Sequence, residues 1–359
     1  MLTGNKGEWS EVYTLLKILS DKQLFAGNSN LQRLTNVVYP IIQIIRNEAH
    51  NNLNFSYQKS QVHVQALGGQ SYLIPISDFT VNASHLLSCI KSAKSGTFNV
   101  PSIESFLNSF GSNSIKAKSS VKSDITIKIY DSRTGLEPTL GFSIKSQLGG
   151  KSTILNASHG TNIVYKIRGG ILSENDISYI NDIDSSSKIM DRLKEISKLG
   201  GKLEYIDTVS PIFRNNLLMV DSSLPRILGE ALIYYYNGVT NSISDIATHL
   251  EANNPLGYDQ STGHSYYSYK IKKMLWDIAL GMMPQTVWTG QYDATGGYLV
   301  VKKSGDIVCY HVYNKTEFEE YLFLNTQFET ASSTRNKFGS IYSQKDELFF
   351  NLNTQIRFK

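Results

Sequence analysis

The sequence has few of the residues on which several protein classes depend. It contains two cysteines, Cys89 and Cys309, which lie far apart and lack the spacing of paired metal ligands. This excludes a disulfide framework and a cysteine-based zinc motif, and it suits a protein of a reducing cytosol. The seven histidines are scattered, without the close pairs that zinc sites use.

Long apolar runs are absent as well. No segment approaches the roughly 18 apolar residues that a membrane-spanning helix needs, and the first residues, Met1 to Glu11, are polar. We therefore expect a soluble, unexported protein with no membrane partner.

The chain has 359 residues, 41% of them hydrophobic, enough for one large domain or two modest ones. Its 35 basic residues outnumber the 31 acidic ones, which favours an anionic partner such as nucleic acid.

Hydrophobic periodicity predicts a chain that mixes helices and strands. Apolar residues recur at helical spacing from Glu8 to about Lys22, and another helix is expected to begin near Pro40 in the apolar run 31–50. Further helices are expected at 84–92, 102–110, 188–199, 224–237, 265–281 and 317–324. Further strands are expected at 61–65, 72–79, 162–168, 298–302, 307–313 and 348–358.

The most informative segment is a predicted hairpin formed by residues 124–130 and 140–148. Each strand has an apolar stripe on one face: Ile125, Ile127 and Ile129 on the first, and Leu140, Phe142 and Ile144 on the second. The tightest register that buries both stripes pairs Ile129 with Leu140 and sets Asp124 directly opposite Lys145. Registers offset by two residues keep the faces but make that contact diagonal.

An aspartate and a lysine on paired strands suit phosphodiester hydrolysis. A hard divalent ion needs oxygen ligands, and the attacking water needs positive charge beside it. Asp124 would hold Mg²⁺, while Lys145 would orient or deprotonate the water and offset the charge of the phosphorane. Ser143 and Gln147 share this polar face. The alternative is an ordinary cross-strand ion pair on a solvated sheet.

Two carboxylates of the first predicted helix, Glu8 and Glu11, fall within or at the edge of its apolar stripe. Because burying an unpaired carboxylate is costly, they are expected to meet cations, or Glu8 to use the positive N-terminal end of the helix. For Glu11, coordination of a shared metal and a structural ion pair both remain open.

Asp124 followed by Ser143-Ile144-Lys145, with twenty residues between Asp124 and Lys145, resembles the PD-(D/E)xK nuclease motif. Ser143 stands where that motif usually has an acid, and no proline precedes Asp124. Lys6-Gly7-Glu8-Trp9-Ser10-Glu11 resembles the Lys-Gly-x-x-x-Glu opening of related nucleases, whose glutamate is associated with the metal. The resemblance implies that Glu11 replaces the missing acid, with Ser143, Gln147 and Glu8 in supporting positions.

Further stretches resemble the HpaII family of type II restriction endonucleases over essentially the full length. They are Gly4-Asn5-Lys6-Gly7-Glu8-Trp9-Ser10-Glu11, Ser146-Gln147-Leu148-Gly149, Ser152-Thr153-Ile154-Leu155-Asn156-Ala157-Ser158, Thr161-Asn162-Ile163-Val164-Tyr165 and Asn351-Leu352-Asn353-Thr354-Gln355-Ile356-Arg357-Phe358. The resemblance implies Mg²⁺-dependent cleavage of double-stranded DNA at the palindrome CCGG, in the cytoplasm of a bacterium with a restriction-modification system. It also implies an α/β, restriction-endonuclease-like fold with a mixed central sheet flanked by helices and an additional C-terminal strand-bearing region.

On this reading, residues 1–250 form the nuclease core with inserted helical and strand segments. Residues 251–359 form a C-terminal helix and a β-rich region that completes DNA recognition. A palindromic target suits a homodimer, although monomers acting in turn satisfy the same symmetry. Two other functions remain open: a junction or repair nuclease with the same metal site, and a DNA-binding module whose nuclease site has decayed.

Reading G·C pairs in the major groove requires donors to guanine and acceptors facing cytosine. Two polar loops supply candidates for DNA contact, for which a solvated loop is the alternative: Lys151, His159 and Asn162 in one, and Arg335, Asn336 and Lys337 in the other. Lys116, Lys118 and Lys122 are further candidates, for contacts to phosphates.

Overall fold

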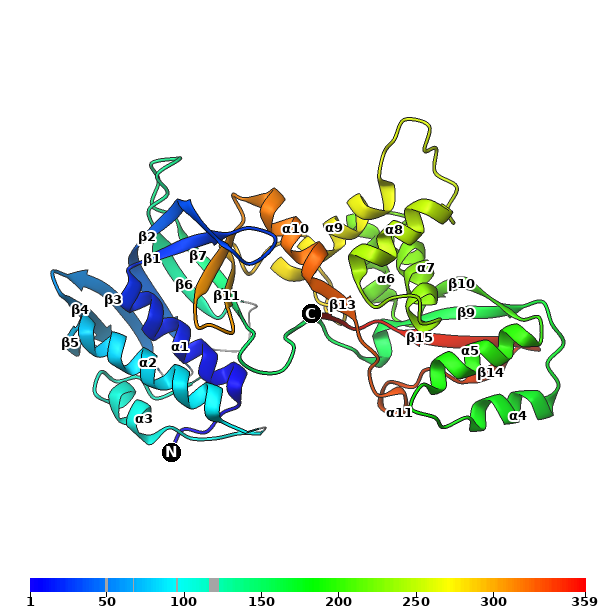
Figure 1. The fold of residues 1–359 in the computed structure, drawn as a ribbon, viewed down its shortest axis with the longest axis horizontal. Coiled ribbons are helices and arrows are strands. Elements are labelled where there is room, and N and C mark those ends of the chain that lie inside the picture. Colours follow the sequence, from blue (N-terminus) through cyan, green and yellow to red (C-terminus); the bar gives the residue numbers. More distant parts are fainter. Residues whose placement is uncertain (49–50, 67, 95, 116–122) are drawn as a thin grey trace. The chain divides into compact units, whose positions relative to one another are not determined.

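The computed structural model describes residues 1–48, 51–66, 68–94, 96–115 and 123–359. The chain forms two compact units, each made of two segments (Figure 1). The first unit contains Met1–Ser152 and Tyr292–Tyr321, and the second contains Thr153–Gln291 and Leu322–Lys359. This division differs from the expected boundary near residue 250, because the chain passes from one unit to the other three times.

The first unit is built on one mixed sheet. Its strands are β1 (Gln23–Gly27), β2 (Arg33–Asn47), β3 (Asn52–Gln58), β4 (Gln61–Ala66), β5 (Ser71–Pro75), β6 (Ile125–Ile129), β7 (Thr139–Ser146), β11 (Gly297–Val301) and β12 (Ile307–His311). They follow the order β1-β12-β11-β7-β6-β2-β3-β4-β5, and β1 also pairs with β2, so the six strands from β1 to β2 close into a ring. The pairs β11–β7 and β1–β12 are parallel, whereas β6–β7 is antiparallel. The predicted α/β class with a mixed sheet is therefore confirmed.

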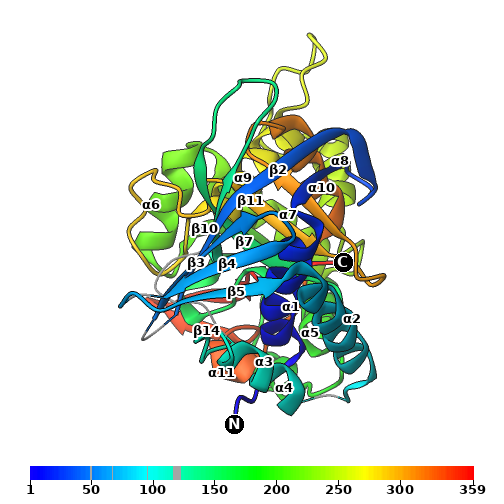
Figure 2. The same cartoon turned by 90° about the vertical axis from the view of Figure 1, so that its left-hand side faces the viewer.

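Helices α1 (Lys6–Asp21), α2 (Ile76–Ser92) and α3 (Pro101–Asn108) belong to this unit, and α10 (Lys315–Asn325) begins in it. Helix α1 confirms the predicted first helix. It starts at a capping box, in which the Asn5 side chain accepts from backbone N–H groups and Glu8 bonds back to the Asn5 N–H at 2.8 Å. Its apolar face is buried among the sheet residues, and α1 and α2 lie side by side in both views (Figure 1, Figure 2).

The prediction of a helix near Pro40 is wrong, because residues 33–47 form the long strand β2. The β-branched residues that follow the proline favour a strand that can pair on both edges. Pro40 itself is tolerated because it pairs with Gln23 beside an irregularity at Ile41, and its carbonyl still accepts from the Tyr130 N–H at 2.9 Å.

Two other predicted strands have different limits. The segment 72–79 ends as a strand at Pro75 and continues as α2. The terminal segment 348–358 is interrupted at Thr354, whose N–H bonds to the Thr161 carbonyl, so it forms two strands that join different sheets.

The second unit combines helices with two smaller sheets. Its helices are α4 (Glu174–Asp182), α5 (Lys188–Lys198), α6 (Pro211–Val220), α7 (Leu224–Tyr236), α8 (Ile243–Asn253), α9 (Tyr266–Leu280), α11 (Ser333–Asn336) and the 3₁₀ turn η1 (His159–Thr161). Its strands are β8 (Thr153–Leu155), β9 (Asn162–Arg168), β10 (Lys202–Thr208), β13 (Thr326–Phe328), β14 (Ile341–Gln344), β15 (Glu347–Asn353) and β16 (Ile356–Phe358). The sheets have the orders β10-β9-β15-β14 and β13-β16-β8, so the C-terminal residues are strand-bearing as predicted. In the described part of the chain, none of the helices combines the length and apolar character needed to span a bilayer.

A buried ion pair anchors the segment that leads towards β6. Arg46, at the end of β2, bonds through Nε to Glu48 Oε1 at 3.1 Å, and both side chains are buried. The same carboxylate accepts from the Ser112 hydroxyl and the Asn113 N–H, while Arg46 Nη2 donates to the Ser114 carbonyl at 2.9 Å. Residues 112–114 are therefore fixed by charge-assisted hydrogen bonds rather than by apolar burial.

We predict that Glu48→Gln lowers the free energy of unfolding of the first unit by about 3 to 5 kcal/mol, because it leaves the Arg46 guanidinium buried beside a neutral partner. Urea unfolding measures the loss. The matched control is Glu137→Gln, which removes an exposed partner of Lys128 and should cost less than about 1 kcal/mol. Equal midpoints for the two variants would contradict the anchoring role of the pair.

Candidate active site

The hairpin of β6 and β7 has a register offset by two residues from the one expected. Ile125 pairs with Phe142 and Ile127 pairs with Leu140. The faces are as predicted, with the isoleucines of β6 and Phe142 of β7 in the core. However, the predicted pairing of Asp124 directly with Lys145 is wrong: the Asp124 N–H donates to the Phe142 carbonyl, and its carboxylate meets Ser143 and the Ile144 N–H.

The turn between the strands accounts for this offset. Asp131 is buried and accepts from the Arg133 N–H at 3.0 Å, while its own N–H donates to the Leu136 carbonyl at 3.0 Å. Gly135 has a φ of 69°, a left-handed conformation that glycine adopts at little cost. The turn, with an aspartate at its start and a glycine at its end, therefore selects the register of the hairpin. The hydrophobic stripes alone are compatible with registers that differ by two residues.

The Asp124 carboxylate is held by the strand that it faces. Its Oδ2 accepts from the Ile144 N–H at 2.6 Å and from the Ser143 hydroxyl at 3.1 Å. The Asp124 N–H in turn donates to the Phe142 carbonyl at 2.8 Å. Among the described residues, the hydrogen bonds to this carboxylate converge on Oδ2, so Ser143 orients Asp124 instead of adding a second carboxylate.

Lys145 is partly buried on the same side of β7. Desolvation lowers the pKa of its ammonium group, and the carboxylates of Asp124 and Glu11 oppose that shift. The ammonium nitrogen lies 5.0 Å from the centroid of the Tyr298 ring, within cation–π range. Tyr298 is buried on β11 and pairs with Ser143, and burial together with the Asp124 charge raises the pKa of its phenol.

Glu11 approaches this group from α1. The helix packs against β7, and the Ser146 hydroxyl donates to the Ser10 hydroxyl at 2.8 Å. These serines are the direct neighbours of Lys145 and Glu11, so the bond holds the two charged residues near one another. Glu8 has a different position, because its carboxylate closes the capping box at the start of α1. The structure thus shows the N-terminal contact considered for Glu8.

The donor set suits a hard cation that keeps part of its water shell. In the described part of the chain there is no cluster of three or more histidine, cysteine, aspartate or glutamate side chains that could hold a metal ion. Magnesium commonly binds through one or two carboxylates together with waters and substrate phosphates, so Asp124 and Glu11 fit its requirements. Gln147 lies just beyond β7, where its N–H bonds to the Val301 carbonyl at 2.9 Å.

The residues predicted to contact DNA fall into two groups. Lys151, His159, Arg335 and Lys337 are exposed, whereas Asn162 and Asn336 are buried. The Asn162 amide donates to the carbonyls of Asn336 and Lys337 and accepts from Asn353 at 2.6 Å. Asn336 donates to the Ser332 carbonyl at 3.0 Å. These two asparagines therefore fix the loops, which contradicts the expectation that their side chains face DNA.

The remaining candidates, Lys116, Lys118 and Lys122, lie outside the described residues.

Sequence reasoning missed Tyr298 and the Ser10–Ser146 contact. Tyr298 occurs in an apolar run that predicts an ordinary buried strand, and only its pairing with β7 reveals its proximity to Lys145. Ser10 lies between the two glutamates of α1, and a buried serine on the sheet-facing side of a helix is the signal that could have identified it.

Two carboxylates and an amine thus come together beside the central strands β6 and β7, a combination of groups that suits phosphodiester hydrolysis. A family model described as HpaII restriction endonuclease matches residues 5–358. The chain is also 47% identical to the type II restriction enzyme HpaII of Haemophilus parainfluenzae over 358 residues, which cover 99% of this chain and 98% of the relative. The chain therefore belongs to the HpaII family of type II restriction endonucleases, which are site-specific deoxyribonucleases, and the resemblance seen in the sequence is confirmed. No solved structure matches it.

We predict that Tyr298 positions Lys145 for cleavage. Tyr298→Leu removes the ring face beneath the ammonium group and should lower kcat by about 2- to 30-fold, the equivalent of about 0.5 to 2 kcal/mol for a cation–π contact. It should also shift the apparent pKa that Lys145 contributes to the pH dependence of kcat. Tyr298→Phe keeps the ring, so its pH profile should stay parental. The thermal midpoint of each variant controls for a packing defect. A Tyr298→Leu enzyme with parental kcat and pH profile would exclude this role.

Proposed function

We propose that the protein hydrolyses both strands of DNA at the palindrome CCGG, with Mg²⁺ held by Asp124 and Glu11 and with Lys145 beside the attacking water. The observation that carries the proposal is the convergence of these three groups in the first unit. Lys145 lies in the electrostatic field of both carboxylates, and Asp124 is oriented by Ser143 and Ile144. We place the reaction in the bacterial cytoplasm, as part of a restriction-modification system.

In this mechanism each residue of the site has one task. Asp124 offers a carboxylate whose rotamer is fixed by the bonds to Oδ2, and Glu11 supplies the second carboxylate from α1. A bound Mg²⁺ would supply Lewis-acid polarisation of the scissile phosphate. Lys145, with its lowered pKa, can orient the attacking water or take its proton, and in its charged form it offsets charge on the phosphorane.

The fold supports the same reading. An aspartate at the start of β6 and a lysine on the antiparallel β7, with β11 parallel to β7 and a helix across the sheet, suit a PD-(D/E)xK nuclease core. The position of the motif's second acid is taken by Ser143, and we assign its task to Glu11.

The proposed target rests on family membership and on the exposed loops. The side chains of Lys151, His159, Arg335 and Lys337 are exposed and carry donors that suit guanine edges or phosphates. We assign base reading to Arg335 and His159. CCGG is a palindrome with two half-sites, which a homodimer or two successive single-strand cuts by a monomer would both serve.

The test of this function is incubation of plasmid DNA with the protein and Mg²⁺, followed by sequencing of the cut ends. We predict that every cut falls within CCGG, and that Asp124→Asn and Lys145→Ala each lower the cleavage rate by at least about 100-fold while DNA binding is kept. The matched controls are Asp346→Asn and Lys202→Ala, which change exposed residues of the second unit and should cleave at the parental rate.

Three results would each redirect the proposal. Cuts restricted to branched DNA would favour a junction nuclease, and specific binding without cuts would favour a decayed module. Parental cleavage by Lys145→Ala would show that the hairpin is not the active site.

We predict that Glu11→Gln raises the Mg²⁺ concentration needed for half-maximal cleavage by about 10-fold, which corresponds to the loss of about 1.4 kcal/mol of metal binding. Glu8→Gln is the matched control on the same helix. It weakens the capping box, so it should lower the thermal midpoint slightly and leave the Mg²⁺ titration unchanged. If the titration shifts for Glu8→Gln and not for Glu11→Gln, the second carboxylate has been assigned to the wrong residue.

A further inference from the structure

A depression of about 420 Å³ lies in the second unit, between α5, the segment 333–340 and the pair of strands β14 and β15. Its lining includes three cationic residues, Lys188, Arg192 and Lys337, and no acidic one. Hydroxyl groups of Ser333 and Ser340 lie among them. The depression therefore offers positive charge and hydrogen-bond donors together, without a carboxylate of its own.

Arg192 is a buried residue of the lining and contributes positive charge to the bottom of the depression. Its side chain is buried, and its guanidinium donates to the carbonyls of Ile183, Asn181 and Gly339 and to the Ser340 hydroxyl at 2.9 Å. Among the described residues no carboxylate forms an ion pair with it. Neutral oxygens satisfy its N–H groups, while the carboxylates of Asp184 and Asp182 act on the guanidinium through space without a direct ion pair, so its charge is only partly offset at the floor.

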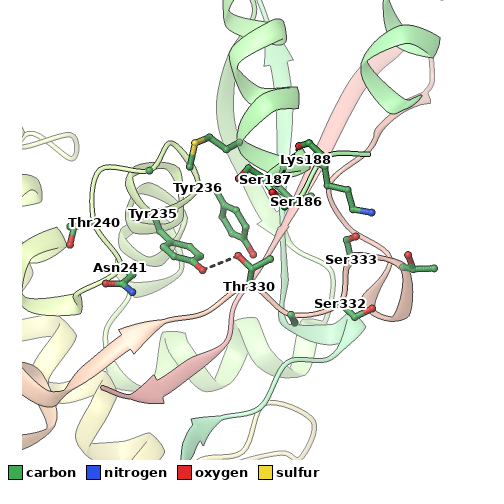
Figure 3. A pocket seen from close by; sticks show the side chains of 16 residues that line it. Ser186, Ser187, Lys188, Tyr235, Tyr236, Thr240, Asn241, Thr330, Ser332 and Ser333 are labelled. Atoms are coloured by element: carbon green, nitrogen blue, oxygen red, sulfur yellow. Dashed lines mark hydrogen bonds between the residues drawn. The ribbon is translucent and has the colours of Figure 1, made fainter. Parts of the chain in front are cut away.

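Lys188 and Lys337 provide charges that a ligand can reach. Lys188 is bonded to Asp184 at 2.8 Å, but that carboxylate is largely exposed and its hold on the lysine is correspondingly weak. Figure 3 shows the Lys188 side chain extending toward Ser333, at the border with a neighbouring cavity of about 510 Å³ that both residues also line. Lys337 is exposed, and in the described chain it forms no ion pair.

The backbone that carries Lys337 is held in place before any ligand arrives. Lys337 has a φ of 53°, a strained conformation for a lysine. Its carbonyl accepts from the buried Asn162 amide at 3.2 Å, and Asn162 is bonded to Asn353 at 2.6 Å. This network holds the backbone of Lys337 in place, so binding an anion orders the lysine side chain without also ordering the loop.

We propose that this depression binds a phosphate of the DNA backbone, through Lys188, Lys337 and Ser333, with Arg192 supplying the field beneath. Three cations with hydroxyl donors match the charged oxygens of a phosphodiester better than the neutral edge of a base. The inference rests on the proposed function, since it takes DNA as the substrate. It adds an anchoring site remote in sequence from the catalytic hairpin.

The experiment measures binding of two fluorescent duplexes, with and without CCGG, by anisotropy from 50 to 200 mM NaCl, with Ca²⁺ in place of Mg²⁺. The double variant Lys188→Ala with Lys337→Ala should bind both duplexes more weakly. The slope of log K against log salt should fall in magnitude by about 1, because contact with one phosphate contributes about 0.9. Lys202→Ala, at an exposed lysine of β10 in the same unit, is the matched control and should keep the parental slope. Arg335→Ala, proposed to touch a base, should instead weaken only the CCGG duplex.

A parental slope for the double variant would overturn the proposal, and so would a loss confined to the CCGG duplex. A second arm titrates inorganic phosphate against the parental protein. Competition at micromolar phosphate would indicate a free-phosphate site and overturn the assignment to DNA, whereas competition only at millimolar levels agrees with it. Failure of this proposal can be told apart from failure of the proposed function. If the parental enzyme cuts at CCGG but the double variant binds DNA with the parental slope, only the phosphate site in the depression is refuted.

Discussion

The hydrogen bond from the Ile144 N–H to Asp124 Oδ2, 2.6 Å long, is the contact on which the proposed active site depends. It is charge-assisted and joins the two strands of the hairpin at the carboxylate itself. It forms in the register set by the turn at Asp131 and Gly135, in which Ile125 pairs with Phe142. A slip of two residues would leave the apolar faces buried but separate Asp124 from these donors, so hydrophobic burial alone does not specify the site.

Strand β7 imposes a second constraint because both of its edges are paired, to β6 on one side and to β11 on the other. Lys145 is thereby held between Asp124 and the ring of Tyr298, in surroundings that disfavour its charge. Two nearby carboxylates and an aromatic face offset part of that cost. Burial thus lowers the pKa of the Lys145 amine, and the two carboxylates limit how far it falls.

The elements that local pattern controls were predictable. The first helix, the hairpin strands with their buried faces and the strand at Asn162 follow from periodicity and capping residues. The predictions that failed concern segments whose structure depends on distant partners. The run after Pro40 becomes a strand because β1, β3 and β6 pair with it. The two-unit division also could not be read from composition, since each unit is assembled from segments far apart in the chain. Of the site, Asp124, Lys145 and Glu11 were recognisable as chemical groups, whereas their coupling through Ser10, Ser146 and Tyr298 required the packing of a helix and a third strand.

The replacement of an acid by Ser143 has a physical consequence for how the site is assembled. A carboxylate at this position would have been held by β7, the strand that also carries Lys145. The position of a carboxylate on α1 depends instead on how firmly the helix packs against that strand. The capping box at Asn5 fixes where α1 begins, and the Ser10–Ser146 bond fixes how it meets β7. Ser143 meanwhile donates to Asp124, which a carboxylate could not do at neutral pH, so the first acid is held more firmly while the second is recruited from the helix. In the proposed site, metal binding would therefore depend on the docking of α1, so a packing change between α1 and β7 would alter cleavage without a change to any charged residue.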